Sequence, residues 1–281
     1  MLRQRVLTAL VLLMVLLPAL FYGQPEPFFL IAGVFIAAGA WEWARMNGMA
    51  MTTSLGAGAL CAMICAGLWW SGWLTEALPR VWLVAGSFWV LVGAWILKAG
   101  VPAWANFARP VRLVLGLTVL CVTWLAVAQA RLRGVNFLLS VLALVWMADI
   151  GAYFSGRALG GRFSRKKLAA SISPGKSWEG VWGGMLGVML MALIWRFADA
   201  AGGATVPSFY TLLGGRGLSF MLMAVVFMAA MSVVGDLVES LVKRSAGVKD
   251  SSALLPGHGG VLDRVDALLP TLPLAMMLIS F

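Results

Sequence analysis

The chain has 281 residues, of which 62% are hydrophobic and only 11% are charged. Soluble domains carry about 25% charged residues, so this composition excludes an ordinary soluble protein and indicates a lipid environment. The net charge of +10 arises from 21 Lys and Arg against 11 Asp and Glu. Basic cytoplasmic loops explain this excess, and we expect no nucleic-acid partner.

Nine apolar runs predict an all-α, polytopic transmembrane bundle of about nine spans, because each approaches the ~20 residues that a helix needs to cross a bilayer. In chain order the runs are 6–22, 28–46, 55–73, 80–97, 112–130, 135–155, 178–197, 218–240 and 265–281. The first run follows two arginines, as in a signal peptide, but no small-residue cleavage site follows it cleanly. We therefore expect it to be retained as a span.

The basic residues predict a cytoplasmic N-terminus. With nine spans, most Lys and Arg residues fall on the cytoplasmic side, as the positive-inside rule requires. The run from Arg165 to Lys167 lies in one of these loops, where it can also anchor on anionic lipid headgroups. Five arginines fall on the other side, namely Arg80, Arg131, Arg133, Arg196 and Arg216.

The charges divide one membrane domain into two parts. Residues 1–135 form an N-terminal packing part with few charges in the spans, chiefly Glu42, which can pair with Arg45 along one helix face. Residues 136–281 form a C-terminal catalytic part, in which acids and bases crowd near the span ends from Asp149 onward. Small residues spaced four apart, which favour close helix packing, are Gly180, Gly183, Gly184 and Gly187.

A polar segment ends the eighth apolar run and continues to the ninth. If the eighth run is one continuous helix, Asp236, Ser240 and Lys243 lie on one face near its end. The loop that follows is rich in Pro and Gly, which stop helices. Beyond it, Asp263 and Asp266 share one face of the next helix, so two acid-bearing helix ends can converge.

Three aspartates so close to a membrane face require an explanation, because an isolated Asp within a span costs at least ~2.5–3.5 kcal/mol. Pairing with nearby Lys and Arg is one explanation. We favour a shared divalent cation, and carboxylate oxygens without a nearby Cys indicate Mg²⁺ rather than Zn²⁺. Together with Lys243, Arg244 and Lys249, such an ion would form a site for a polyphosphate.

Two upstream segments carry further candidates. Asp149 and Tyr153 share a helix face near the end of the sixth run, where a buried acid is either functional or bonded to a neighbouring helix. Ser173 or Ser177 can cap the seventh run, and Lys176 beside that helix N-terminus is typical of an anion site. The single histidine, in a glycine-rich loop, either contacts a phosphate or shapes the loop.

These segments together resemble the phosphatidate cytidylyltransferases, also called CDP-diacylglycerol synthases, over roughly residues 149–266. The resemblance rests on Asp-x-x-Ala-Tyr-x-x-Gly-Arg from Asp149, Ser-Pro-x-Lys-Ser-x-Glu-Gly from Ser173, Ser-x-x-Lys-Arg from Ser240, Lys-Asp at 249–250, His-Gly-Gly from His258 and Asp-Arg-x-Asp from Asp263. It implies that CTP and phosphatidate give CDP-diacylglycerol and pyrophosphate with Mg²⁺, in phospholipid biosynthesis. It also implies a cavity that opens to the cytoplasm from the cell inner membrane, and it admits a second ion and a homodimer.

The resemblance also implies roles for individual residues. The implied metal ligands are Asp236, Asp263 and Asp266. The implied catalytic residues are Ser240, Lys243, Arg244, Lys249 and Asp250. The implied substrate-binding residues are Asp149, Tyr153, Ser173, Lys176, Glu179, His258, Gly259, Gly260 and Arg264.

Three alternatives stay open at this point. A transporter with an intramembrane acidic pathway would spread polar residues through several spans near the midplane, whereas here they gather at one face. A CTP-dependent enzyme that acts on another lipid phosphate or on a polyprenol is not excluded by fold alone. A structural scaffold has no need of the His-Gly-Gly loop or of the paired acids.

Overall fold

The computed structural model describes residues 2–164 and 166–281, and over this part of the chain it is helical, without a β-strand. Eight helices of the described residues are long and apolar enough to cross a membrane. They are α1 (Leu2–Phe21), α2 (Glu26–Met46), α3 (Met51–Trp70), the rod of α4 (Pro79–Phe88), η1 (Trp89–Gly93) and α5 (Ala94–Asn106), α6 (Arg109–Arg133), α7 (Val135–Leu159), α8 (Trp178–Gly202) and α10 (Leu218–Ser245). The chain is therefore a multi-pass membrane protein, as the composition predicts.

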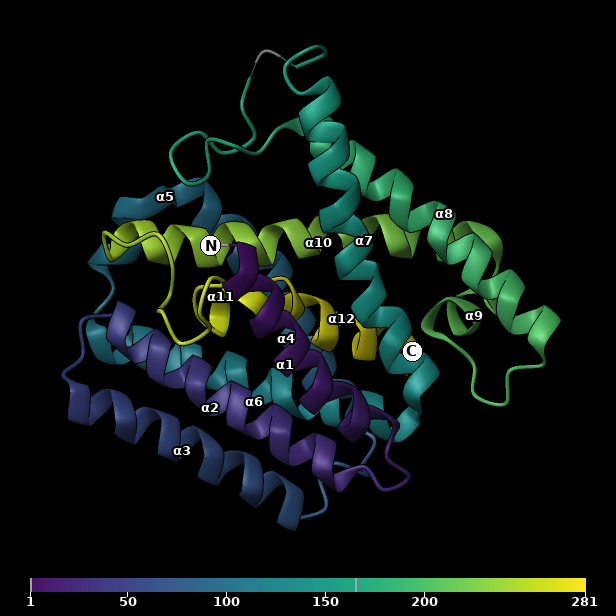
Figure 1. Ribbon diagram of the computed structural model, residues 1–281, viewed down its shortest axis with the longest axis horizontal. Helices are drawn as coiled ribbons and strands as arrows, with labels where there is room; N and C mark the ends of the chain where they lie inside the picture. Colours follow the sequence, from purple (N-terminus) through teal and green to yellow (C-terminus); the bar gives the residue numbers. More distant parts are fainter. Residues whose placement is uncertain (1, 165) are drawn as a thin grey trace.

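The ninth apolar run differs from its prediction. Residues 265–281 do not form one spanning helix, because the four-residue α11 (Leu262–Val265) and a turn precede α12 (Leu268–Ser280). The 13 residues of α12 reach about 20 Å at 1.5 Å per residue, short of a hydrocarbon core of about 30 Å. Instead, α12 is buried in the middle of the molecule, beside α4, α6 and α10 (Figure 1).

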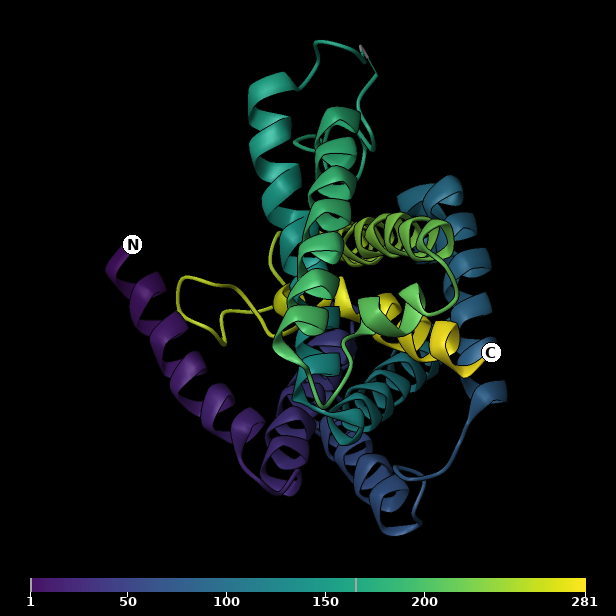
Figure 2. The same ribbon diagram turned by 90° about the vertical axis from the view of Figure 1, so that its right-hand side faces the viewer.

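Helices α7 and α8 form a closely packed antiparallel pair, which projects from the rest of the bundle (Figure 2). A Cβ atom on Gly184 would lie 2.6 Å from the Ala148 carbonyl oxygen, and one on Gly151 would lie 2.8 Å from that of Gly183. No larger residue fits at either position without a shift of the backbone. The close helix packing predicted from the glycine spacing is therefore confirmed. It brings the end of α7 close to the start of α8.

The N-terminal helices form a second packed group, with α2 between α3 and α6. Three cysteines meet inside it, since Cys61 and Cys65 of α3 and Cys121 of α6 are all buried and free. The Sγ atoms of Cys61 and Cys121 are 3.4 Å apart. This group lies below α10 and α12 in the view of Figure 1, and its helix α6 packs against α12.

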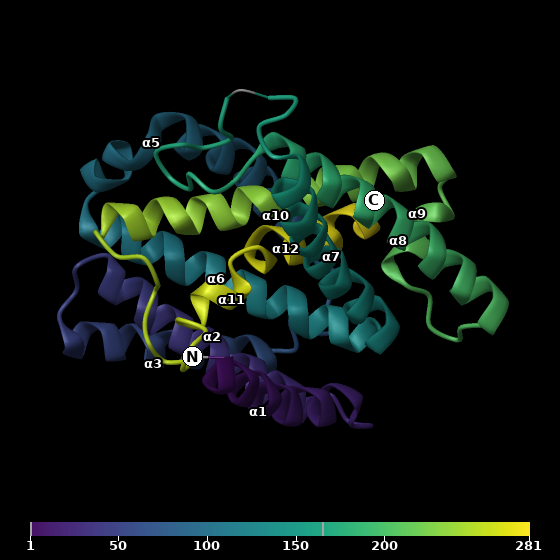
Figure 3. The same cartoon turned by 45° about the horizontal axis from the view of Figure 1, so that its top comes forward.

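Two long connections lie near the C-terminal half of α10. The segment between α7 and α8 arches over it, and the segment between α10 and α11 returns from its end towards α2 (Figure 3). Arg244 links them, because its guanidinium donates to the carbonyl oxygens of Ile172 at 3.2 Å and Val248 at 3.3 Å. The polar segments recognised in the sequence are therefore gathered at one end of the bundle.

Candidate active site

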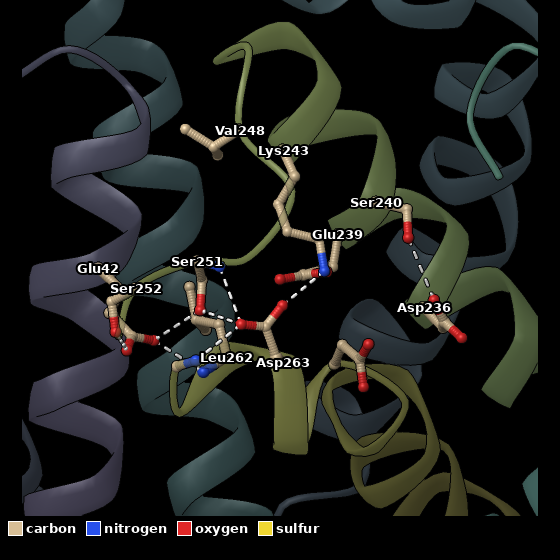
Figure 4. A network of polar contacts seen from close by, with 12 residues as sticks. Glu42, Asp236, Glu239, Ser240, Lys243, Val248, Ser251, Ser252, Leu262 and Asp263 are labelled. Atoms are coloured by element: carbon tan, nitrogen blue, oxygen red, sulfur yellow. Dashed lines mark hydrogen bonds and ion pairs between the residues drawn. The ribbon is translucent and has the colours of Figure 1, made fainter. Parts of the chain in front are cut away.

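Helix α10 presents a polar face near its C-terminal end. Asp236, Glu239, Ser240 and Lys243 are spaced by three and four residues and so lie along one side of the helix (Figure 4). Ser240 donates to Asp236 at 3.2 Å, and Lys243 forms ion pairs with Glu239 and Asp263. The predicted face is confirmed, and Glu239 is an additional member of it.

Asp263 lies at the start of α11 with a side chain that is 6% exposed. Its Oδ1 accepts from Lys243 Nζ at 2.6 Å. Its Oδ2 accepts three hydrogen bonds at 2.8 Å, from the Ser251 hydroxyl and from the backbone N–H groups of Ser251 and Gly260. Burial alone would raise the pKa of Asp263, but the hydrogen bonds from Lys243, Gly260 and Ser251 outweigh it and hold this pKa below its ordinary value.

Glu42 of α2 reaches the same loop from the N-terminal part of the chain. It is fully buried and accepts from the N–H groups of Val261 at 2.9 Å and Leu262 at 2.8 Å. The hydroxyls of Ser252 and Ser251 donate to it at 2.5 and 3.2 Å. We call Glu42, Ser251, Ser252 and residues 260–263 the loop network. A buried carboxylate needs such donors, and Glu42 obtains them from the loop.

The predicted pairing of Glu42 with Arg45 is wrong. The guanidinium of Arg45 lies 4.8 Å from the ring centre of Trp41, and its side chain is exposed. The side chain of Glu42 points into the protein, where hydroxyl and backbone N–H groups of the loop donate to it. It therefore needs no cation, and the side chain of Arg45 lies at the surface instead. An acid within an otherwise apolar span is a functional candidate, and that signal could have identified Glu42 in the sequence.

The two glycines after His258 allow the loop to close around the acids. Gly259 has a φ of +81°, and a Cβ atom there would lie 2.7 Å from Asp263 Oδ2. A Cβ atom on Gly260 would lie 2.1 Å from Ser251 Oγ and 2.3 Å from Glu42 Oε1. The loop network can therefore form only with glycine at 260, which gives the His-Gly-Gly element a structural reason.

A cleft of about 530 Å³ opens between α7, the start of α8 and α10. Asp149, Tyr153 and Arg157 of α7 line it, together with Lys176 and Asp236, which form an ion pair. The side chains of Lys176 and Asp236 are 27% and 29% exposed. We refer to this space as the cleft. Three sequence segments that are far apart in the chain thus contribute to one polar surface.

Asp266 lies in the turn between α11 and α12. Its Oδ1 accepts the N–H of Ala267 at 2.7 Å. Burial, and then the negative charge of Asp236, raises the pKa of Asp266 above its ordinary value. The two carboxylates therefore repel one another, and a bound cation would relieve that repulsion.

The chemistry of the donors, carboxylate oxygens, suits a divalent cation such as Mg²⁺; within the described residues, no three of these carboxylates bring oxygen atoms within 4.8 Å of one another. The three predicted ligands differ in how much of their bonding capacity is used. A carboxylate has about four lone-pair sites; Asp263 accepts four hydrogen bonds, Asp236 accepts from Lys176 and Ser240, and Asp266 accepts one. Asp236 and Asp266 thus have the most free capacity for an ion, and Asp263 has it only at Oδ1, which Lys243 alone contacts.

Other predicted residues shape the connection before α8. Ser177 caps α8 by accepting the Gly180 N–H at 3.2 Å, as predicted. Glu179 is buried and accepts the N–H groups of Phe163 at 3.0 Å and Ser164 at 2.7 Å, so it folds the connection instead of facing the cleft. Arg244 likewise contacts backbone carbonyls.

The remaining predicted residues lie around the site with few contacts among the described residues. Tyr153 is 59% exposed and accepts a hydrogen bond from Arg157 at 3.0 Å. His258 is half-buried in a turn closed by its N–H and the Leu255 oxygen at 2.8 Å. Ser173 is half-buried in the turn before α8, and the exposed residues are Lys249, Asp250 and Arg264. Arg165 lies outside the described residues.

Sequence reasoning missed four residues of the site, namely Glu42, Glu239, Ser251 and Ser252. Glu239 stands between two predicted residues on the same face of α10, so its spacing could have identified it. The two serines directly follow Lys249 and Asp250. Their role depends on a partner some 210 residues away in the chain, which no local pattern reveals.

Fold and site together define a multi-pass membrane protein with carboxylates and ammonium groups clustered at one end of its helices, suited to phosphate chemistry. The sequence matches the Cytidylyltransferase family across residues 3–281, and the chain belongs to this family. It is 38% identical to a phosphatidate cytidylyltransferase of Pseudomonas aeruginosa, over 97% of this chain and 95% of that protein. It is also 38% identical to one of Haemophilus influenzae, over 97% and 96%.

Proposed function

We propose that this protein is a phosphatidate cytidylyltransferase, which converts CTP and phosphatidate to CDP-diacylglycerol and pyrophosphate. The proposal is supported by relatives of that name that align with nearly the whole chain. The observation that carries it is the convergence of three separate polar segments on one end of the bundle. There Lys176 pairs with Asp236 in the cleft and Lys243 pairs with Asp263 beside it.

The proposed reaction needs positioning and charge neutralisation more than proton transfer. A phosphate oxygen of phosphatidate forms a bond to the α-phosphorus of CTP, while the bond from that phosphorus to the bridging oxygen breaks and pyrophosphate leaves. The nucleophile is already anionic, so no general base is required. Lys176 and Lys243 pair with Asp236 and Asp263, and each can turn to phosphate oxygens when substrate binds.

We further propose that Mg²⁺ binds at this site, held by Asp236 and Asp266, with Asp263 as a ligand or as the residue that positions them. When bound, the ion supplies positive charge to the polyphosphate. Ser240 fixes one oxygen of Asp236 at 3.2 Å and so orients the carboxylate. The loop network fixes Asp263 independently of the ion.

We propose that the site faces the cytoplasm from the inner membrane. The support comes from the loop charges, because the N-terminus and the connections after α7 and α10 carry a large share of the Lys and Arg residues. Contacts join these segments, because Thr8 donates to the Pro256 carbonyl oxygen at 2.8 Å and Arg244 donates to that of Ile172 at 3.2 Å. CTP is available on that side.

The proposal is tested by turnover of the purified protein in detergent with labelled CTP, phosphatidate and Mg²⁺. Parallel reactions contain EDTA, or ATP in place of CTP. We expect CDP-diacylglycerol only with CTP and the metal. Product that persists in EDTA would refute the Mg²⁺ proposal alone. No product from protein that is demonstrably folded would refute the activity and favour another lipid phosphate acceptor or a transporter.

A further inference from the structure

A second polar pocket, of about 350 Å³, reaches the loop network at Ser251 and shares no lining residue with the cleft. It is bounded by the end of α2, the start of α6 and the end of α10 with the residues that follow. Three arginines line it: Arg45 from α2 and Arg109 and Arg112 from α6. We call it the arginine pocket. No residue among its lining is acidic.

The arginines are positioned without a charged partner. Within the described residues, the ion pairs of this end of the bundle involve Lys176 and Lys243 and none of these guanidinium groups. Arg45 is placed by the ring of Trp41. Arg109 lies over Gly48, where a Cβ atom would be 3.6 Å from its Cζ. The Nε of Arg112 is buried and has no hydrogen-bond partner.

Simple exposure in a cytoplasmic loop would account for one or two unpaired arginines. It does not account for three that converge from two helices on one concave surface with a buried, unsatisfied donor. The start of α6 adds to the positive potential, since this 25-residue helix has no side-chain cap and no acid in its first turn. Guanidinium groups match phosphate oxygens in geometry as well as in charge.

We infer that the arginine pocket binds a phosphate group, carried either by an anionic lipid headgroup or by a soluble polyphosphate. The pocket also includes Ser251, whose hydroxyl donates to both Glu42 and Asp263. A ligand there would lie against the residue that fixes Asp263. Use of this pocket by a substrate rests on the proposed function, whereas phosphate binding itself does not.

The test is protection of individual arginines from phenylglyoxal, read by peptide mass spectrometry on the intact protein in phosphatidylcholine nanodiscs. EDTA is present throughout, so neither turnover nor metal-dependent binding contributes, and KCl keeps the ionic strength constant. One arm adds sodium pyrophosphate, and the other replaces part of the phosphatidylcholine with phosphatidate. At ten times Kd, we expect modification of Arg109 and Arg112 to slow about tenfold, while exposed Arg80 is unchanged.

The arms identify the source of the phosphate group. Protection by phosphatidate alone assigns the pocket to a lipid headgroup, and protection by pyrophosphate assigns it to a soluble polyphosphate. Equal rates at Arg109 and Arg112 in both arms would overturn the inference, even if the protein turns over CTP. Radiolabelled ligand binding to the double variant Arg109→Gln, Arg112→Gln checks the result, with Arg80→Gln as the matched control. Binding by the double variant with the same stoichiometry and affinity as the control would also overturn the inference.

Discussion

The loop network and the cleft lie side by side but are built in opposite ways. In the loop network, Glu42 is fully buried and Asp263 accepts four hydrogen bonds. In the cleft, Asp149 and Tyr153 are exposed, and Asp236 accepts only one hydrogen bond at each oxygen, from Lys176 and Ser240. One region has its polar groups satisfied within the protein, and the other leaves bonding capacity for a ligand.

This difference indicates a division of labour. A fully satisfied buried network specifies one geometry, because each lost partner leaves an unsatisfied group in a region of low dielectric constant. Ion pairs in a partly exposed cleft contribute little to stability and can exchange partners with a ligand. The loop network is therefore expected to position the site, and the cleft is expected to receive the substrate.

The largest loss of turnover is expected from a change at Asp263, the carboxylate of the loop network that contacts Lys243. Asp263→Asn puts an amide where Lys243 and Ser251 now donate, so both the charge and an acceptor are lost. We expect turnover to fall by ~10²–10³. The measurement is turnover, with size-exclusion chromatography and the thermal midpoint as checks of folding. An active, folded variant would contradict the central role of Asp263.

A smaller loss is expected at Glu42, which acts through the loop. Glu42→Gln keeps the size of the side chain but turns one acceptor into a donor facing Ser252 and the Val261 N–H. We expect kcat/KM to fall ~10–100-fold, as for outer-shell partners of metal ligands, with a lower thermal midpoint. Glu26→Gln, on the exposed start of the same helix, is the matched control. Equal behaviour of the two variants would show that Glu42 only packs.

A pair of glycine variants compares the two regions directly. A Cβ atom on Gly260 meets Ser251 Oγ at 2.1 Å, whereas one on Gly175, which lines the cleft, meets nothing within 4 Å. We expect Gly260→Ala to lower stability by about 1–3 kcal/mol through overpacking and to reduce turnover. Gly175→Ala should stay within ~0.5 kcal/mol. Thermal midpoints and turnover measure both, and a tolerated Gly260→Ala would show that the loop network is not rigid.

The smallest effect is expected in the way the thermal midpoint depends on pH. The pKa of Asp263 lies below its ordinary value in the folded protein, so its ionised form stabilises the fold above the unfolded pKa of about 3.9. That contribution is lost as the pH falls from there through the folded pKa. We expect the thermal midpoint to drop over this range, less steeply for Asp263→Asn. Parallel curves would assign the acid sensitivity to other carboxylates.

The sequence by itself determined the class of protein, most of the helices and the faces of α10 that carry polar residues. Long apolar runs have few alternatives to helices in lipid, since every backbone N–H and C=O must be satisfied within the segment. A spacing of three and four residues then places Asp236, Ser240 and Lys243 together without knowledge of any neighbour. The close approach of α7 and α8 followed from glycine spacing for the same reason.

Only the tertiary structure decided which groups meet across the chain. Glu42 binds a loop more than 200 residues further on, Lys176 meets Asp236, and three arginines from α2 and α6 share one pocket. The apolar run after Asp263 packs inside the bundle as a short helix instead of crossing the membrane. These outcomes depend on contacts between distant segments, because burial, charge pairing and hydrogen bonding are settled by whichever neighbours the packed helices bring together.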